Sequence, residues 1–202
     1  LKLGAACIDM GAGTTGISIF YNHQLIFASN IRFGSENITS DIMQAFQLSF
    51  NEAERIKTLH GGLVVTNLDD NDLIELSFSD ANKEFYNYDR PFISRAELIS
   101  VIRPRCEEII EEIQISLDKS GFEQLLSKRI VFTGGGSQLP GLYELASEYF
   151  GSRIRIGRPM RVQGLPQALQ GSQFSAIIGL AIEISNLQDE VWDFEIPTIL
   201  EP

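Results

Sequence analysis

An acidic residue followed by a short bend rich in glycine and threonine is the chain's first candidate for phosphate and metal chemistry. Asp9 ends an apolar run, and Gly11, Gly13, Thr14 and Thr15 follow it before a second apolar run begins. Successive backbone N–H groups in a glycine-rich bend can form a concave site for phosphate oxygens. A carboxylate beside such a bend suits Mg²⁺, which takes oxygen ligands and keeps several of its waters. A tight hairpin with an incidental acid is the alternative for this stretch alone.

A second glycine bend follows much later in the chain. It leads from an apolar strand through Gly134, Gly135, Gly136 and Ser137 into a helix that is expected to begin near Pro140. The spacing is neither that of a Walker loop nor that of a dinucleotide fingerprint, because the Lys-Ser/Thr pair and the G-x-G-x-x-G pattern are both missing. Three adjacent glycines instead allow a flat ring to lie directly on the backbone.

A third stretch places Glu54 and Lys57 on one face of a predicted helix. The alternative for this pair is a solvated i,i+3 ion pair worth about 0.2–0.5 kcal/mol. Asn51 with Glu54 could equally be a helix-capping arrangement. Taken singly, each of the three stretches has a structural explanation that is simpler than a ligand site.

Together and in this order, the three stretches resemble the nucleotide site of the superfamily that contains actin, sugar kinases and heat-shock chaperones. The amino-acid sequence of these stretches is most similar to the FtsA family of actin-like bacterial cell division proteins. The runs that carry this resemblance cover nearly the whole chain: Asp9–Thr15, Glu52–Gly61, Val101–Arg105, Phe132–Leu142 and Phe174–Ala181.

The resemblance implies a protein that binds ATP with Mg²⁺ between two lobes. In that site Asp9 would be the catalytic carboxylate and would hold the metal through water. The resemblance assigns Gly11, Gly13, Thr14 and Thr15 to the phosphates, Glu54 and Lys57 to the ribose or base, and Gly134, Gly135, Gly136 and Ser137 to the adenine.

The N-terminal elements that must position these residues are predicted from apolar patterning. The expected strands are residues 4–10, 15–21 and 24–31. Asn22-His23 is expected to be a two-residue hairpin turn, because Asn tolerates left-handed backbone angles. A second helix is predicted over residues 51–59. The helix before it is predicted from apolar residues four positions apart: Ile38, Ile42, Phe46 and Phe50.

The middle of the chain is predicted to hold short strands and one long helix. Residues 63–65 and 73–78 look strand-like, and the acidic turn Asp69–Asp72 between them is expected to be a solvated hairpin tip. Ser94 and Glu97 have the spacing of a capping box that opens a helix to about residue 117. The later elements are expected to be a strand at 129–133, a helix at 140–150, an edge strand at 153–156 and a helix at 172–184.

These elements predict an α/β lobe with an actin-like, ribonuclease H-like mixed sheet flanked by helices, and a small α+β insertion subdomain. The main subdomain is expected to comprise residues 1–50 and 123–187. Residues 51–122 would form the inserted subdomain, and residues 188–202 would form a tail.

Three arginines, Arg95, Arg103 and Arg105, lie along the long helix. On general grounds they belong to a solvated helix face. The FtsA resemblance implies a second role, because the insertion subdomain of that family receives the C-terminal tail peptide of the tubulin-like FtsZ. Such a tail is apolar with acidic residues, and a guanidinium can bind a carboxylate bidentately.

Composition excludes several classes of function. The formal net charge of −11 argues against nucleic-acid binding. No apolar run approaches the roughly 20 residues of a membrane-spanning helix, so the chain is expected to be soluble. Cys7 and Cys106 are expected to be reduced, buried thiols.

The chain starts at Leu1, and the first glycine bend follows almost at once. With the resemblance, we expect a partner lobe upstream and a membrane-targeting helix downstream. The implied protein polymerises on the cytoplasmic face of the inner membrane at the septum, anchors FtsZ filaments of the Z ring and recruits later divisome proteins.

Two alternatives from the same superfamily stay open. A small-molecule kinase would phosphorylate a substrate hydroxyl, but no segment resembles its base or substrate pocket. A type IV pilus assembly scaffold is disfavoured by the Arg-Pro-Arg sequence at residues 103–105. In the preferred interpretation the protein is mainly a scaffold with at most weak ATPase activity.

Overall fold

A five-stranded mixed sheet is the centre of the computed structural model, which describes residues 4–77, 91–122, 129–151 and 154–185. Its strand order is β3-β2-β1-β6-β7. The first three strands form an antiparallel meander, and β6 and β7 add parallel to β1. The strands are β1 (Ala5–Met10), β2 (Thr15–Tyr21), β3 (Gln24–Ile31), β6 (Ile130–Thr133) and β7 (Ile154–Ile156).

The predicted N-terminal strands are confirmed to within one residue. Side chains along β1 alternate, so Ala6, Ile8 and Met10 are buried on one face while Cys7 and Asp9 lie on the other. The turn between β2 and β3 is also as expected, since both of its residues have positive φ, 48° and 65°. That geometry matches the twist of a two-residue hairpin.

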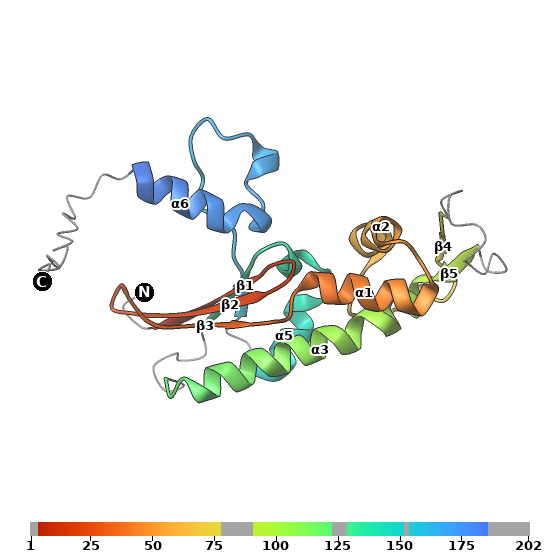
Figure 1. Cartoon of the computed structure of the whole chain (residues 1–202), viewed down its shortest axis with the longest axis horizontal. Coiled ribbons are helices and arrows are strands. Elements are labelled where there is room, and N and C mark those ends of the chain that lie inside the picture. Colours follow the sequence, from red (N-terminus) through yellow and green to blue (C-terminus); the bar gives the residue numbers. More distant parts are fainter. Residues whose placement is uncertain (1–3, 78–90, 123–128, 152–153, 186–202) are drawn as a thin grey trace, which may run out of the picture.

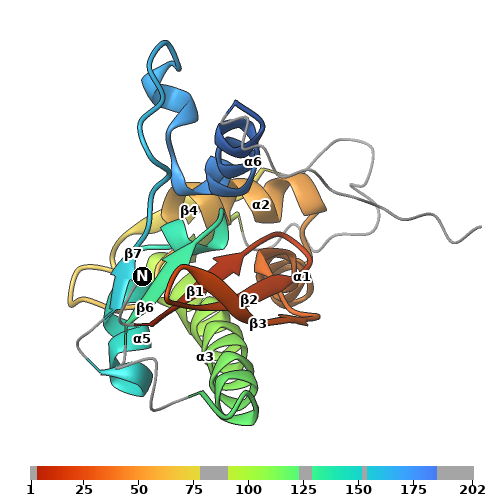
Figure 2. The same ribbon diagram turned by 90° about the vertical axis from the view of Figure 1, so that its left-hand side faces the viewer.

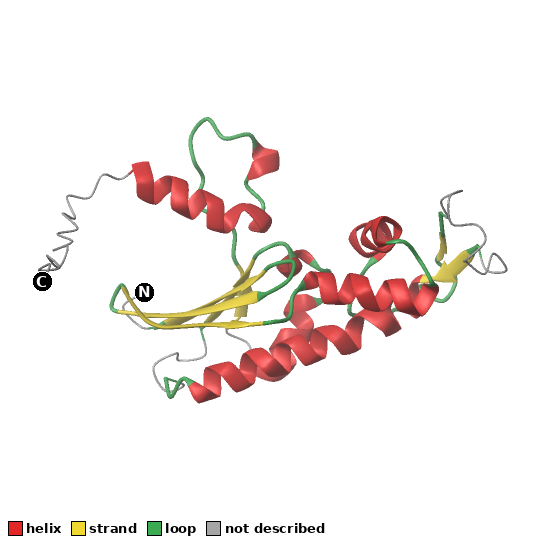
Figure 3. Ribbon diagram, in the orientation of Figure 1, coloured by secondary structure: helices red, strands yellow, loops and turns green. Residues whose placement is uncertain are grey.

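Helices flank the sheet on both sides. Figures 1 and 3 show α1 (Ser35–Phe46), α3 (Arg95–Lys119) and α5 (Leu142–Phe150) on one side of the strands and α6 (Ser175–Ser185) on the other. The apolar stripes of α1, α3 and α5 join the buried face of the sheet in one hydrophobic core. Figure 2 shows the segment between β7 and α6 extending away from the sheet.

The junction between the first two helices differs from the prediction. α1 ends at Phe46, because Gln47 adopts a left-handed conformation with φ 55°. α2 (Phe50–His60) begins after Ser49, whose side chain accepts a hydrogen bond from the Glu52 backbone N–H. Phe50 therefore belongs to the second helix, and the suggested cap formed by Asn51 and Glu54 is wrong.

A second, two-stranded sheet pairs β4 (Leu73–Glu75) with β5 (Phe92–Ser94) at the far end of α3. The capping box of α3 is confirmed, with Ser94 and Glu97 bonded reciprocally. Residues 63–65 do not form a strand. The acidic turn is exposed at residues 70–72, as predicted, but Asp69 is buried and accepts hydrogen bonds from Thr66.

The predicted division into two subdomains stays a prediction, because one core runs through both parts. α3 starts beside the small sheet and continues beneath the large one (Figure 1). Its buried residues Leu98 and Ile109 belong to the same core as Ile8 and Phe132. The proposed tail, residues 188–202, and Arg153 of the predicted edge strand lie outside the described residues.

None of the described helices combines the length and the apolar composition that crossing a bilayer requires.

Candidate nucleotide site

The parallel pairing of β1 with β6 brings the two glycine bends into contact. Asp9 at the end of β1 lies opposite Thr133 at the end of β6. The next residue, Gly134, has φ +85°, and a Cβ there would lie 2.3 Å from Asp9 Oδ1 and 2.5 Å from the Met10 carbonyl oxygen. Only glycine fits this approach, since a side chain would be strained and would also clash.

Asp9 is the least satisfied charged group at this junction. Among the described residues its carboxylate has no hydrogen bond and no ion pair, and burial raises its pKa. A partly desolvated carboxylate without a partner is stabilised by an arriving cation. A single partly buried carboxylate is a donor that suits Mg²⁺ held through its water shell.

The first turn of α1 is hydrogen-bonded to the backbone of the first glycine bend. The backbone N–H of Ser35 donates to the Gly11 carbonyl at 3.0 Å, and that of Glu36 donates to Ala12 at 2.8 Å. Gly34 approaches so closely that a Cβ would lie 2.2 Å from the Ala12 carbonyl oxygen. In contrast, a Cβ at Gly13 would meet nothing within 4 Å. The bend is thus braced on one side and open on the other.

The two threonines of the bend have different surroundings. Thr14 is exposed, as a phosphate contact requires. Thr15 is fully buried and donates its hydroxyl to the Phe33 carbonyl at 2.8 Å. In this structure the Thr15 hydroxyl supports the loop, and its assignment to phosphate stays a prediction.

The second glycine bend also divides into supporting and open positions. Ser137 is buried and donates its hydroxyl to the Gly134 carbonyl at 2.8 Å. A Cβ at Gly136 would lie only 3.0 Å from Met10 Cβ, whereas at Gly135 the nearest atom is Gln173 Cβ at 3.8 Å. Gly135 therefore has the most open backbone of the three glycines among the predicted adenine contacts.

Glu54 and Lys57 are joined through α1 rather than exposed as a simple surface pair. Lys57 Nζ donates to Glu54 Oε2 at 2.6 Å, to Thr39 Oγ1 at 2.8 Å and to the Ser35 carbonyl at 3.1 Å. The i,i+3 ion pair suggested as the alternative is present, but only half of it is solvated, because Lys57 is 8% exposed and the Glu54 side chain is 42% exposed. Burial raises the pKa of Glu54, but the bonds from Lys57 and Thr39 outweigh it and leave the pKa below its usual value.

The contacts form a continuous path from α2 to the first glycine bend. Lys57 binds the Ser35 carbonyl, and the Ser35 N–H binds Gly11. The sequence reasoning missed Gly34, Ser35 and Thr39, although Thr39 carried a readable signal. It is a hydroxyl residue next to Ile38 on the apolar stripe of α1, and a polar group in such a place needs a buried partner.

The arginines of α3 already have partners within the chain. Arg95 donates to the His60 carbonyl at 3.1 Å and lies 3.4 Å from Asp69. Arg103 donates to Glu107 at 2.7 Å and to the Leu63 carbonyl at 3.2 Å. These contacts join both guanidinium groups to neighbouring parts of the chain.

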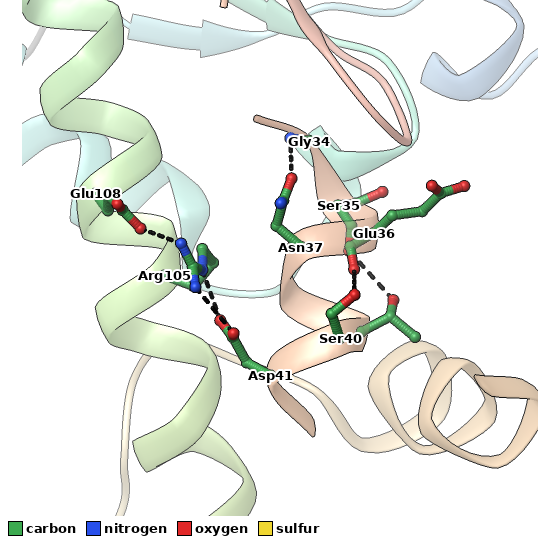
Figure 4. Close-up of polar contacts among 9 residues, drawn as sticks. Gly34, Ser35, Glu36, Asn37, Ser40, Asp41, Arg105 and Glu108 are labelled. Carbon is green, nitrogen blue, oxygen red and sulfur yellow. Dashed lines mark hydrogen bonds and ion pairs between the residues drawn. The ribbon is translucent and has the colours of Figure 1, made fainter. Parts of the chain in front are cut away.

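Arg105 has the strongest partner of the three. Its Nε and Nη2 atoms donate to the two carboxylate oxygens of Asp41 at 2.6 Å and 2.9 Å, and Nη1 binds Glu108 (Figure 4). Whether any of the three arginines binds a peptide stays a prediction.

A pocket of about 1220 Å³ lies beside the second glycine bend, between Ser137–Tyr143 and the segment from Ile156 to Gln173. Asp9, Glu54 and Lys57 do not line it. The pocket therefore adjoins the second glycine bend, and the charged residues predicted for the site do not line it.

Comparisons with known proteins identify relatives of the chain. Residues 6–179 match the family model described as "Cell division protein FtsA". The cell division protein FtsA of Agrobacterium fabrum is 40% identical over 183 residues, which is 90% of this chain and 40% of that protein. This chain thus spans well under half the length of that relative.

Solved structures of relatives share the fold. MreB5 of Spiroplasma citri bound to ADP superposes with a TM-score of 0.72 at 19% identity, over 92% of this chain and 56% of that one. The PilM–PilN type IV pilus biogenesis complex gives a TM-score of 0.64 at 20% identity, over 90% and 46%. At such identities the match establishes the actin-like fold and nothing more specific.

Proposed function

Since this chain belongs to the FtsA family of cell division proteins, we propose that it forms one lobe of an ATP-binding, actin-like scaffold of the division septum. In this proposal the lobe has a main subdomain and an inserted one, and the full-length protein polymerises at the cytoplasmic face of the membrane. A C-terminal helix outside this chain would bind the membrane. The protein would anchor FtsZ filaments there and recruit later divisome proteins.

The observation that carries the ATP proposal is the contact between the two glycine bends beside the Asp9 carboxylate, which has no partner among the residues that the structure describes. Asp9 would orient the waters of Mg²⁺, while Gly13 and Thr14 would present N–H and O–H donors to the phosphates. The Gly11 N–H already donates to the Thr14 carbonyl at 2.9 Å, so Gly11 would act by shaping the bend. Bound Mg²⁺ would supply charge neutralisation at the phosphate oxygens.

At the other end of the nucleotide, Gly135 offers an open backbone surface for the base, and the Glu54 carboxylate, whose side chain is 42% exposed, would accept a hydrogen bond from the ribose. Lys57 is satisfied within the protein and would act mainly by holding Glu54 in place. Since the second lobe completes such a site, the lobe alone should bind nucleotide weakly.

ATP titration of the full-length protein, with Mg²⁺ and with a chelator, tests this role. Asp9→Asn should weaken Mg²⁺-dependent binding by roughly tenfold to a hundredfold, as expected for a group that holds a metal through its water shell. Asp118→Asn, at an exposed position of α3, is the matched control and should bind as the unmodified protein does. Equal Mg²⁺-dependent affinities for both variants would refute the role of Asp9.

We also propose that Arg95, Arg103 and Arg105 receive the acidic C-terminal tail peptide of FtsZ. The support is positional: the three side chains follow one another along α3, and Arg105 keeps 26% of its surface exposed. Arg105→Ala is the preferred variant, because a charge reversal would set a new carboxylate against Asp41 and Glu108. It should weaken peptide binding, whereas Arg32→Ala, an exposed arginine of the loop before α1, should not.

A further inference from the structure

The ion pair between Arg105 and Asp41 joins two helices across a sequence separation of 64 residues. Asp41 lies on α1, and its carboxylate takes both Nε and Nη2 of the Arg105 guanidinium on α3. Figure 4 shows the two side chains reaching toward each other across the gap between the helices. This fork-to-fork geometry is the one in which arginine binds carboxylates most strongly.

The pair is partly shielded from water but still accessible. Arg105 is 26% exposed and Asp41 is 23% exposed. The hydrogen bonds that Arg105 donates to Asp41 raise the pKa of Arg105 further, so the guanidinium stays charged. An ion pair that is neither fully solvated nor sealed from solvent can exchange one carboxylate for another at moderate cost.

Neither of the other two arginines, Arg95 and Arg103, donates two hydrogen bonds to one carboxylate among the described residues. Arg95 is 3.4 Å from Asp69, and Arg103 is 3.5 Å from Glu148 while its Nε binds Glu107 on its own helix. Both donate also to backbone carbonyl groups. Within the part of the chain that the structure describes, Arg105 is the arginine of this set whose fork is filled by a carboxylate from another element.

Asp41 is held in place by the anchoring of α1. The first turn of that helix is bonded to the carbonyls of Gly11 and Ala12, and Thr39 is bonded to Glu54 and Lys57. α1 cannot move without breaking these bonds, so Asp41 can leave Arg105 only by rotating its side chain. Glu108 on α3 is 46% exposed and is the easier partner to displace.

We propose that Asp41 is an internal competitor for the peptide site and fills the guanidinium of Arg105 until a carboxylate of an acidic peptide replaces it. This inference rests on the proposed role of Arg105 in peptide binding. Asp41 would then set specificity, because a ligand must supply a carboxylate that can accept both hydrogen bonds of the fork. Peptides with amides at that position would not displace it.

Fluorescence anisotropy with a labelled C-terminal tail peptide of FtsZ tests the competition on the full chain. Asp41→Asn should tighten binding by roughly threefold to tenfold, the range that corresponds to losing one partly exposed charged competitor. Glu36→Gln is the matched control. It removes the same charge from the same helix, but Figure 4 shows its side chain on the side of α1 that faces away from Arg105. Its affinity should not change.

The variants separate this inference from the function on which it rests. If Arg105→Ala binds the peptide as the unmodified chain does, the peptide role of Arg105 is wrong. If Arg105→Ala weakens binding while Asp41→Asn leaves it unchanged or weaker, the site stands and the competition is wrong. The double variant Asp41→Asn/Arg105→Ala should show no gain, and a persisting gain would also refute competition.

A second measurement needs no substitution and covers the case in which Asp41→Asn fails to fold. The carboxylate carbon of Asp41, followed by NMR in the unmodified chain, should shift as the peptide is added, because Asp41 loses its guanidinium partner. A peptide that saturates the site without shifting this resonance would overturn the proposal.

Discussion

At one end of the candidate site the Asp9 carboxylate has no hydrogen-bonding partner among the described residues, whereas at the other end Glu54 and Lys57 are bonded to each other and to α1. The two carboxylates respond in opposite ways. Burial raises the pKa of Asp9, while the bonds from Lys57 and Thr39 bring that of Glu54 below its usual value.

The difference separates a region kept for a ligand from one that supports the fold. A charged carboxylate without a partner destabilises the folded state slightly, and a bound cation stabilises it strongly. A fully paired network fixes the relative positions of its helices and has little to gain from a ligand. Substitution of Asp9 should therefore affect mainly ligand binding, whereas substitution of Lys57 should affect mainly the stability of the fold.

The largest effect is expected where the two glycine bends touch. Gly134→Ala should reduce the free energy of unfolding by about 2–4 kcal/mol, because φ is +85° and the new Cβ would overlap Asp9 and Met10. Urea denaturation measures the change. Gly13→Ala is the control, since its Cβ meets nothing within 4 Å, and it should stay within about 0.5 kcal/mol of the unmodified chain. Equal losses at both glycines would contradict the close contact.

The next effect is expected at the paired end. Lys57→Ala should destabilise the chain by about 2 kcal/mol, because Glu54 and Thr39 lose a buried partner while Glu54 remains partly solvated. Lys119→Ala, at the exposed end of α3, should change the midpoint of unfolding little. A Lys57 variant as stable as the Lys119 variant would mean that the network does not support the fold.

The smallest effects should have opposite signs and a shared pH dependence. The folded pKa of Glu54 lies below its ordinary value of 4.5, so its charge stabilises the fold above that value, and the contribution is lost as the pH falls through the folded pKa. The folded pKa of Asp9 lies above its ordinary value of 3.8, so its contribution is most favourable below that value and is lost as the pH rises through the folded pKa.

At neutral pH, Glu54→Gln should therefore lower stability and Asp9→Asn should raise it. Both differences from the unmodified chain should shrink in acid. Urea midpoints for the three proteins, measured between about pH 3 and pH 7, follow both carboxylates through their titration ranges. Differences of the same sign at neutral pH would remove the contrast between the two ends.

Local patterns explain why the strands were predictable. Alternating apolar residues and glycine bends placed β1, β2 and β3 to within one residue, because each pattern depends on neighbours along the chain. The break between α1 and α2 was misplaced because the four-residue apolar repeat continues to Phe50. In the structure the left-handed Gln47 ends the first helix, and Ser49 caps the second.

The sequence by itself determined which residues could serve a nucleotide: the acid Asp9, the glycine bends, and the Glu54–Lys57 pair on one helical face. These are properties of residue type and short spacing. Only the tertiary structure decided which charges are already satisfied, since Lys57 meets Ser35 and Arg105 meets Asp41 across packed helices. Such partners are set by distances between elements, and spacing along the chain carries no information on those distances.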